Sequence, residues 1–173
     1  MKRATILALL ACVLLPIAAW ASMHFFDNER GTISISESGI ESKGTQLVRL
    51  GQIVPPPGHS LGPVKFLTGA LISGTLAEGG KFSSLGSSFV VIGRGNYGEP
   101  KGTIFVGAFH GGIHWTLISK NGANLVFELH GTIQGQLWNG RMVRLQTKQT
   151  IVTTEEQLAK GIGHILIGKT TAP

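Results

Sequence analysis

Cysteine is almost missing from this chain of 173 residues, and the single example, Cys12, lies in an apolar N-terminal run. Beyond that run the chain can form no disulfide and offers no thiol nucleophile. Packing of apolar side chains and pairing of backbone groups must therefore stabilise the fold. Exported proteins without cysteine are more common in bacteria than in the eukaryotic secretory route, which favours a bacterial source.

Acidic residues are also few, with one aspartate, Asp27, and eight glutamates. Few carboxylates could form a catalytic pair. The side chains of adjacent residues such as Glu155 and Glu156 point in different directions in a helix and in a strand. The Gly-x-Ser-x-Gly elbow of an esterase is missing from the sequence as well. We therefore predict no catalytic residues, no cofactor and no enzymatic activity, and a hydrolase is the most distant alternative.

Charged residues make up only 14% of the chain, and the basic ones are scattered along it. A concentrated basic patch interleaved with aromatic residues is typical of nucleic-acid binding. The sequence has no such run of basic residues, so nucleic acid is not an expected partner. Removal of Lys2 and Arg3 with a signal peptide lowers the formal net charge from +6 to +4. This mild excess permits attraction to anionic polysaccharide or to cell-surface components.

What the N-terminus does contain is the three parts of a secretory signal peptide in their usual order. Lys2 and Arg3 supply positive charge, Ala4–Ala18 is an apolar run, and Ala19-Trp20-Ala21 is a small-x-small cleavage site. We predict a signal peptide over residues 1–21 and a single all-β domain over residues 22–173, with Ser22 as the mature N-terminus. The expected location is secreted or extracellular, with a periplasmic or surface-associated location as the alternative.

Two other interpretations of the same segment are possible. An uncleaved anchor would need the 18 residues Ala4–Ala21, which is at the short limit of a membrane span, so we expect no stable membrane insertion after cleavage. Lipid attachment at Cys12 is favoured by the lipoprotein-box-like Leu9–Cys12. A lipidated cysteine is followed by a polar tether, whereas Val13–Ala19 is still apolar, so Cys12 is interpreted as part of the signal.

Alternation of apolar and polar residues, interrupted by glycine, asparagine and proline, predicts strands along the mature chain. The expected strands are Gly31–Ser36, Thr45–Val54, Val64–Thr68, Leu71–Leu76, Ser88–Ile92, Thr103–His110, Ile113–Ser119, Leu125–Leu137, Met142–Val152 and Ile162–Ile167. One short helix is expected at Thr154–Lys160, with Thr154 as N-cap and Gly161 as stop, so less than about 10% of the chain is helical. Pro55–Gly58 should separate an N-terminal β pair from the main sheet. We predict an antiparallel β-sandwich or jelly-roll-like domain, with a closed β-barrel as the alternative.

Asn121-Gly122 marks a hairpin whose register follows from the pattern of its side chains. A three-residue loop, Asn121–Ala123, pairs Lys120 with Asn124 and makes one face apolar. The predicted apolar pairs are Trp115 with Leu129, Leu117 with Phe127, and Ile113 with Gly131. The polar face then holds His114, Thr116, Glu128 and His130. A two-residue loop would mix the faces, so we predict the longer loop and a core position for Trp115. Asn139-Gly140 marks a second tight turn.

The polar face of this hairpin suggests a metal site, because His114 and His130 lie opposite each other with Glu128 diagonal. His110 is about 13 Å farther along the strand and cannot complete the site. Three ligands on an open face make a marginal site. We therefore interpret the histidines as a polar cross-strand pair and predict no metal site.

Gly93–Gly98 fits the pattern Gly-x-Gly-x-x-Gly and follows the strand-like Phe89–Ile92. A dinucleotide site requires a helix to begin at this point, so that its N-terminal amides meet the pyrophosphate. Glu99–Gly102 and another strand follow instead. The segment is therefore predicted to be a turn.

Tyr97 and Trp138 both lie beside predicted turns, next to asparagines. Exposed aromatic rings on loops can stack on sugars, which makes a carbohydrate-binding module the second functional hypothesis. The alternative is that each ring covers one end of the β core.

Several segments resemble one group of exported bacterial proteins. They are Leu61–Gly74, Gly79–Phe82, Ile104–Phe109 and Trp115–Leu117. The chain is similar, from about Gly31 to Thr171, to exported proteins of unknown function from Acidobacteria-type genomes, relatives of PEP-CTERM proteins that an exosortase sorts. The resemblance implies a fold and carries no catalytic residues. Thr170–Pro173 stands where the sorting motif would begin, so free secretion or a truncated sorting signal is expected rather than surface anchoring. The leading functional hypothesis is an exported, non-enzymatic β-domain with a structural, extracellular-matrix or surface-interaction role.

Overall fold

Twelve strands and one short helix make up most of residues 24–173, the part of the chain that the computed structural model describes. The strands are β1 (His24–Glu29), β2 (Thr32–Ser36), β3 (Gly39–Lys43), β4 (Gln46–Leu50), β5 (Gly62–Leu67), β6 (Leu71–Thr75), β7 (Gly79–Phe82), β8 (Ser88–Gly93), β9 (Gly102–Asn121), β10 (Asn124–Leu137), β11 (Met142–Thr154) and β12 (Ile162–Thr171). Helix α1 is Glu155–Ala159. The predicted signal peptide, Cys12 and the predicted cleavage before Ser22 lie outside the described residues.

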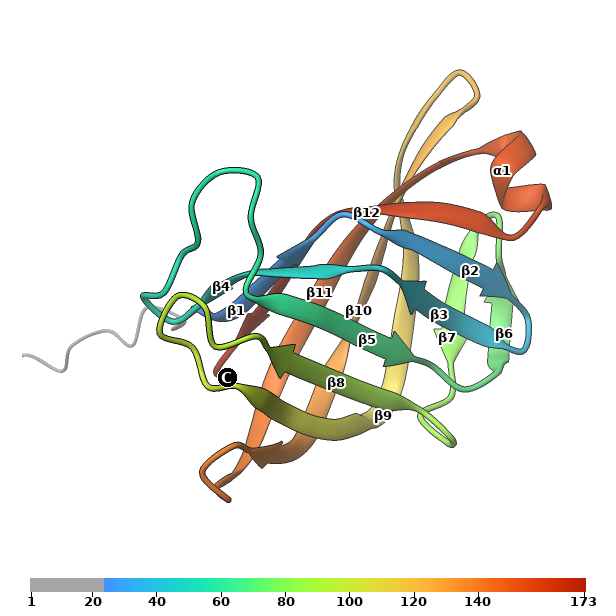
Figure 1. The fold of residues 1–173 in the computed structure, drawn as a ribbon. Helices are drawn as coiled ribbons and strands as arrows, with labels where there is room; N and C mark the ends of the chain where they lie inside the picture. The colour runs from blue at the N-terminus through green and yellow to red at the C-terminus, as the bar shows by residue number, and fades with distance from the viewer. Residues whose placement is uncertain (1–23) are drawn as a thin grey trace, which may run out of the picture.

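The strands close into an eight-stranded antiparallel barrel (Figure 1). β1 and β2 together form one interrupted barrel strand, because both pair with β12, and β3 and β4 form the next, because both pair with β5. The order then runs through β5, β8, β9, β10, β11 and β12 and returns to β1. β6 and β7 form a separate hairpin that pairs with the far half of β9.

A sharp bend between β1 and β2 lets this barrel strand follow the curvature of the wall. Arg30 has a φ of 61° and Gly31 a φ of 88°, both in the left-handed region. At Gly31 the chain passes close to the connection between β3 and β4. An added Cβ there would lie 2.6 Å from the backbone nitrogen of Thr45. A residue with a side chain at this position would therefore push β1/β2 away from β3/β4.

Aromatic side chains fill much of the barrel interior. Phe89 of β8 contacts Phe26, Phe66, Phe105 and Phe109, with ring centroids 5.8–6.2 Å apart. All five rings are buried, and they come from strands on different sides of the barrel. The interior at this level is therefore a packed core, as in other small barrels whose side chains meet across the lumen.

A buried polar cluster lies beside these rings, where the first strand meets the last two. The side-chain amides of Asn28 in β1 and Gln149 in β11 exchange hydrogen bonds of 2.8 and 3.2 Å. Gln149 also donates to the hydroxyl of Thr147, which is 3.0 Å from that of Thr170 in β12. Gly168 of β12 makes room for the amide pair, since an added Cβ there would lie 2.1 Å from Oε1 of Gln149.

The all-β prediction is confirmed, but the preferred sandwich or jelly roll is wrong and the barrel alternative is right. Alternation along a strand shows which side chains are buried and does not show whether the sheet closes. Closure depends on pairing between β1 and β12, which no local pattern reveals. The predicted N-terminal β pair likewise belongs to the same sheet as the rest, with Pro55–Gly58 in a connecting loop.

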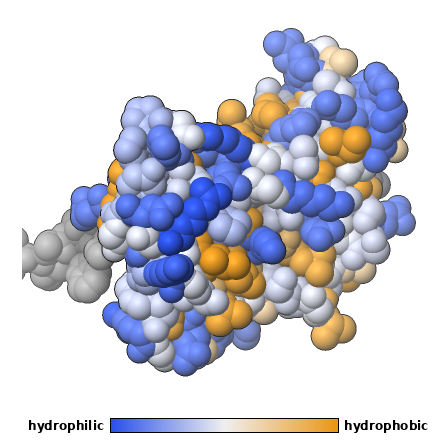
Figure 2. Space-filling view, viewed as in Figure 1, coloured by the Kyte–Doolittle hydropathy of each residue, from blue (hydrophilic) through white to orange (hydrophobic). Residues whose placement is uncertain are grey.

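Individual elements differ from the prediction in a few places. Strands β1, β3 and β7 were not predicted, and β9 was predicted as two strands separated at Gly111-Gly112. The helix at Thr154–Lys160 and the turn at Asn139-Gly140 are confirmed. On the face shown in Figure 2, apolar side chains lie in small groups among polar ones.

The Asn121-Gly122 hairpin has the predicted body and a different tip. Asn121 pairs with Asn124, so the three-residue loop is wrong, and a register shift beside Phe127 then restores the predicted alignment. The confirmed pairs are Trp115 with Leu129, Leu117 with Phe127, and His114 with His130. Ile113 falls in a second irregularity, between the pairs His130–His114 and Thr132–His110, and is not paired with Gly131 as predicted.

Candidate functional site

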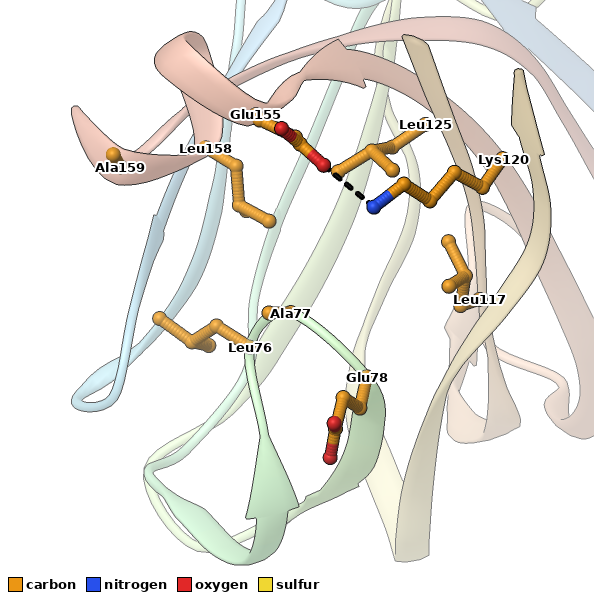
Figure 3. Close-up of a pocket in the computed structure, with 9 residues that line it drawn as sticks. All are labelled: Leu76, Ala77, Glu78, Leu117, Lys120, Leu125, Glu155, Leu158 and Ala159. Carbon is orange, nitrogen blue, oxygen red and sulfur yellow. Dashed lines mark ion pairs between the residues drawn. The ribbon is translucent and has the colours of Figure 1, made fainter. Parts of the chain in front are cut away.

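An open cavity of about 580 Å³ lies at one end of the barrel, between the tip of the β9–β10 hairpin, helix α1 and the β6–β7 turn (Figure 3). Most of its lining is apolar, and three charged residues stand among the apolar ones. The lining residues are Leu76, Ala77, Glu78, Leu117, Lys120, Leu125, Glu155, Leu158 and Ala159. Three segments that are distant in sequence therefore build one concave surface.

The cavity begins where the packed interior of the barrel ends. Trp115 is 1% exposed and stacks on Phe127 at a centroid distance of 4.2 Å, which closes the lumen at this level. The next inward-facing residues toward the hairpin tip, Leu117 and Leu125, belong to the edge of the packed core and also line the cavity. The indole nitrogen of Trp115 donates to the carbonyl oxygen of Leu76 at 2.9 Å, which fixes the β6–β7 turn at the cavity wall.

Helix α1 forms another wall, and local sequence explains why it is helical. Thr154 caps it: the hydroxyl of Thr154 accepts from the backbone of Gln157 at 3.1 Å, and the side chain of Gln157 accepts from the backbone of Thr154 at 3.2 Å. The backbone nitrogen of Glu155 also donates to the carbonyl of Ala123 at 3.0 Å, which ties the helix to the hairpin turn. Leu158 is the buried residue of the helix, and it points into the cavity (Figure 3).

An ion pair crosses the cavity opening between the hairpin and the helix. Nζ of Lys120 lies 2.6 Å from Oε1 of Glu155, and both side chains are more than half exposed (Figure 3). Exposed pairs of this kind contribute less than about 1 kcal/mol to stability. Glu78, on the β6–β7 turn, adds a second carboxylate to the lining. The opening thus offers hydrogen-bond donors and acceptors above an apolar interior.

The opposite end of the barrel carries a smaller apolar pocket of about 460 Å³. Trp138, which is 49% exposed, lines it together with Phe25, Leu50, Ile53 and Pro100. Tyr97, the second aromatic residue that the sequence singled out, does not share this pocket. Its ring packs against the core, and its hydroxyl lies 2.9 Å from Nδ1 of His59. The structure therefore separates the two predicted sugar-stacking residues.

The Gly93–Gly98 segment is a loop, as predicted, and it surrounds an anion that the chain itself supplies. The Glu99 carboxylate accepts backbone N–H bonds from Gly95, Asn96 and Tyr97 at 2.8–3.1 Å. Burial of Glu99 works to raise its pKa, but these amides outweigh that effect and hold the pKa below its ordinary value. The amides that a phosphate would need are already occupied.

His114 and His130 stack on the outer wall, with ring centroids 4.9 Å apart and planes at 20°. Loss of solvation, then the nearby His130 and Lys81, lower the pKa of His114 below its usual value. Glu128 forms an ion pair with Lys148 at 3.2 Å. Among residues 24–173, no group of three or more histidine, cysteine, aspartate or glutamate side chains is arranged to hold a metal ion.

None of the cavity residues was predicted to form a site, because Leu117, Leu125 and Leu158 follow the same alternation or amphipathic pattern as core residues. No helix in the described part of the chain is long and apolar enough to cross a membrane. No protein-family model, curated protein or solved structure matches this chain.

Proposed function

We propose that this chain is an exported, non-enzymatic binding domain whose end cavity takes up a small, mostly apolar molecule. The observation that carries the proposal is the cavity beside α1, whose volume lies within the roughly 300–1,000 Å³ typical of ligand pockets. Its lining has the usual composition of such pockets, with apolar walls and a few polar groups at one side. Small eight-stranded barrels can hold one ligand in this way.

The charges at the opening favour an uncharged polar end on the ligand. A carboxylate would have to displace Glu155 from Lys120, which would leave the Glu155 carboxylate without its cation at the same opening. A hydroxyl or amide can instead donate to Glu155 and accept from Lys120 while the ion pair stays intact. The proposed ligand is therefore an apolar chain or ring system that ends in a neutral hydrogen-bonding group.

Calorimetric titration of the mature protein with 1-decanol and with decanoate tests this proposal. We expect saturable binding of the alcohol with a negative heat-capacity change, because apolar surface is buried, and weaker binding of the anion. The variant Ala77→Phe should reduce the affinity for 1-decanol at least about tenfold, since the added ring occupies the cavity. Leu85→Phe is the matched control, because Leu85 is 86% exposed in a distant loop.

Two results would contradict the proposal: binding of 1-decanol that does not saturate, and an Ala77→Phe variant that binds as the control does.

A second candidate function is carbohydrate binding at the opposite end, and the half-exposed ring of Trp138 beside Pro100 favours it. The same titration with neutral oligosaccharides distinguishes the two. Saturable sugar binding that Trp138→Ala abolishes and Ala77→Phe preserves would support the second candidate.

A further inference from the structure

A continuous row of side chains crosses the outer wall of the barrel, with one residue from each of five neighbouring strands. The register pairs them in order as Lys81 of β7, His114 of β9, His130 of β10, Lys148 of β11 and Lys169 of β12. The three lysines and His114 are exposed, and His130 is half-buried. These five residues are called the basic row below.

The row continues across the meeting point of the first and last strands. Asp27 of β1 lies opposite Lys169, and Arg49 of β4 lies opposite Asp27, with its Nε 3.1 Å from the Asp27 carboxylate. Glu128, two residues before His130 on β10, forms an ion pair with Lys148. Two carboxylates therefore stand among four permanent cations, and the wall keeps a positive excess even when both histidines are neutral.

The spacing of the basic row suits a linear polyanion. Neighbouring strands lie about 4.8 Å apart, so five strands place their charges at regular intervals over roughly 19 Å. The row runs around the barrel, across the strands, and is therefore convex. A flexible chain can follow this curve and contact each cation, whereas a flat membrane surface touches only the strands at the point of tangency.

The two imidazole rings argue against single-stranded nucleic acid as the occupant. Proteins that bind such strands present aromatic faces on which bases stack. His114 and His130 stack on each other instead, so their facing surfaces are already covered. Carboxylate groups need no stacking platform, because ammonium and imidazolium groups bind them through charge-assisted hydrogen bonds.

We propose that the basic row binds a linear polysaccharide that carries carboxylate groups, and that this binding strengthens as the histidines become protonated. The site is separate from the end cavity and does not depend on a ligand there. The charged groups that face the histidine pair are Lys81 on β7, Glu128 on β10 and Lys148 on β11, and His110 lies farther along β9. Protonation adds charge next to these lysines, which is unfavourable in the free protein and becomes favourable when a polyanion lies over the row.

The pKa of His114 supports this dependence on pH. It lies below the ordinary value because of lost solvation and the neighbouring His130 and Lys81, so His114 is mostly neutral near neutral pH. Acidification charges the ring, and a bound carboxylate raises its pKa by favouring the charged form. By linkage, the polyanion should bind more tightly below the pKa of His114 than above it.

Binding of the mature protein to polygalacturonate, measured at about pH 5.5 and about pH 7.5 over a range of salt concentrations, tests the proposal. We expect affinity that falls with salt and is higher at the lower pH. Replacing Lys81, Lys148 and Lys169 together by glutamine should weaken binding roughly tenfold. The matched control replaces Lys43, Lys65 and Lys101 together by glutamine. It removes the same amount of positive charge from other parts of the surface.

The variant His114→Gln/His130→Gln should bind as the wild type does at the higher pH and lose the strengthening at the lower pH. Equal weakening in the two triple variants would overturn the site, because it would show only an effect of net charge. Binding of single-stranded DNA or of anionic phospholipid vesicles as tight as that of polygalacturonate would overturn the choice of partner. Unchanged pH dependence in the double histidine variant would overturn the role of the imidazoles.

Discussion

Glu99 shows how one side chain determines the conformation of a glycine-rich loop. The sequence of this loop resembles a phosphate-binding pattern, yet its amides converge on a carboxylate only a few residues away. Glu99 is 3% exposed and is charged because these N–H groups compensate for its burial. The negative charge is thus part of the loop structure at neutral pH.

Replacing Glu99 by glutamine should destabilise the protein by about 1.5–3 kcal/mol at neutral pH, because an amide donor would then face the N–H of Tyr97. The folded-state pKa lies below the ordinary 4.5, so the carboxylate stabilises the fold above that value and loses its effect as the pH falls through the folded-state pKa. Denaturant melts should therefore show a difference between variant and wild type that shrinks in acid. The exposed Glu37→Gln is the control, and a difference constant down to the lowest pH would contradict this account.

The tryptophans provide a second residue-scale prediction. Trp115 is buried against Phe127 and bonded to Leu76, whereas Trp138 is half exposed. Trp115→Ala should cost about 3–5 kcal/mol in unfolding free energy, and Trp138→Ala should cost much less. Equal costs in denaturant melts would contradict the assignment. The core position of Trp115 was predicted from sequence, because alternation is a local property, whereas the sequence left open whether Trp138 is exposed or covers one end of the core.

At the scale of elements, the β9–β10 hairpin shows what a sequence pattern can determine. Matching apolar faces predicted the pairing of Trp115 with Leu129 and of His114 with His130, and both are confirmed. The pattern could not predict the loop, because a register shift near Phe127 compensates for the shorter turn. The bulge leaves Ile118 unpaired, so that Lys120 pairs with Leu125 near the tip. The predicted pairs hold from Leu117 to His114.

Helix α1 and the cavity beside it differ in predictability for a physical reason. The capping residues Thr154 and Gln157 and the stop at Gly161 are adjacent in sequence, so the helix could be predicted. The cavity requires the β6–β7 turn, the hairpin tip and the helix to meet at one end of the barrel. Leu117 and Leu125 have the same local pattern as the filled core, so the sequence does not show that they line a cavity.

For the whole molecule, the decisive contact is the one that closes the barrel. The hydrogen-bonded amides of Asn28 and Gln149 link β1 to β11 across Gly168 of β12. Apolar and polar residues alternate along the strands of a sandwich and of a barrel alike, so this pattern does not distinguish the two folds. Buried polar pairs of this kind are best known for fixing the register of the elements they join.

Double-mutant analysis of this pair tests its role in closure. Gln149→Leu and Asn28→Leu should each cost at least about 1–3 kcal/mol, because each leaves a buried amide without its partner. The double variant should cost less than the sum of the two, since neither amide then remains to be satisfied. Gln146→Leu, on the outer face of β11, controls for the leucine itself. Additive costs in denaturant melts would show that the amides act independently.

The pairing of β1 with β12 also determines when the protein can finish folding. Hairpins such as β9–β10 need only a short turn, but the last contact requires the two ends of the described chain to find each other, and such non-local closure is slow. In the export route we propose, β1 crosses the membrane first and β12 last, so β1 must wait with an unpaired edge until nearly the whole chain has passed. That exposed edge is the kind that pairs with other chains. The same topology that covers the edges of β1 and β12 in the native protein therefore makes the interval before closure its period of greatest risk of aggregation.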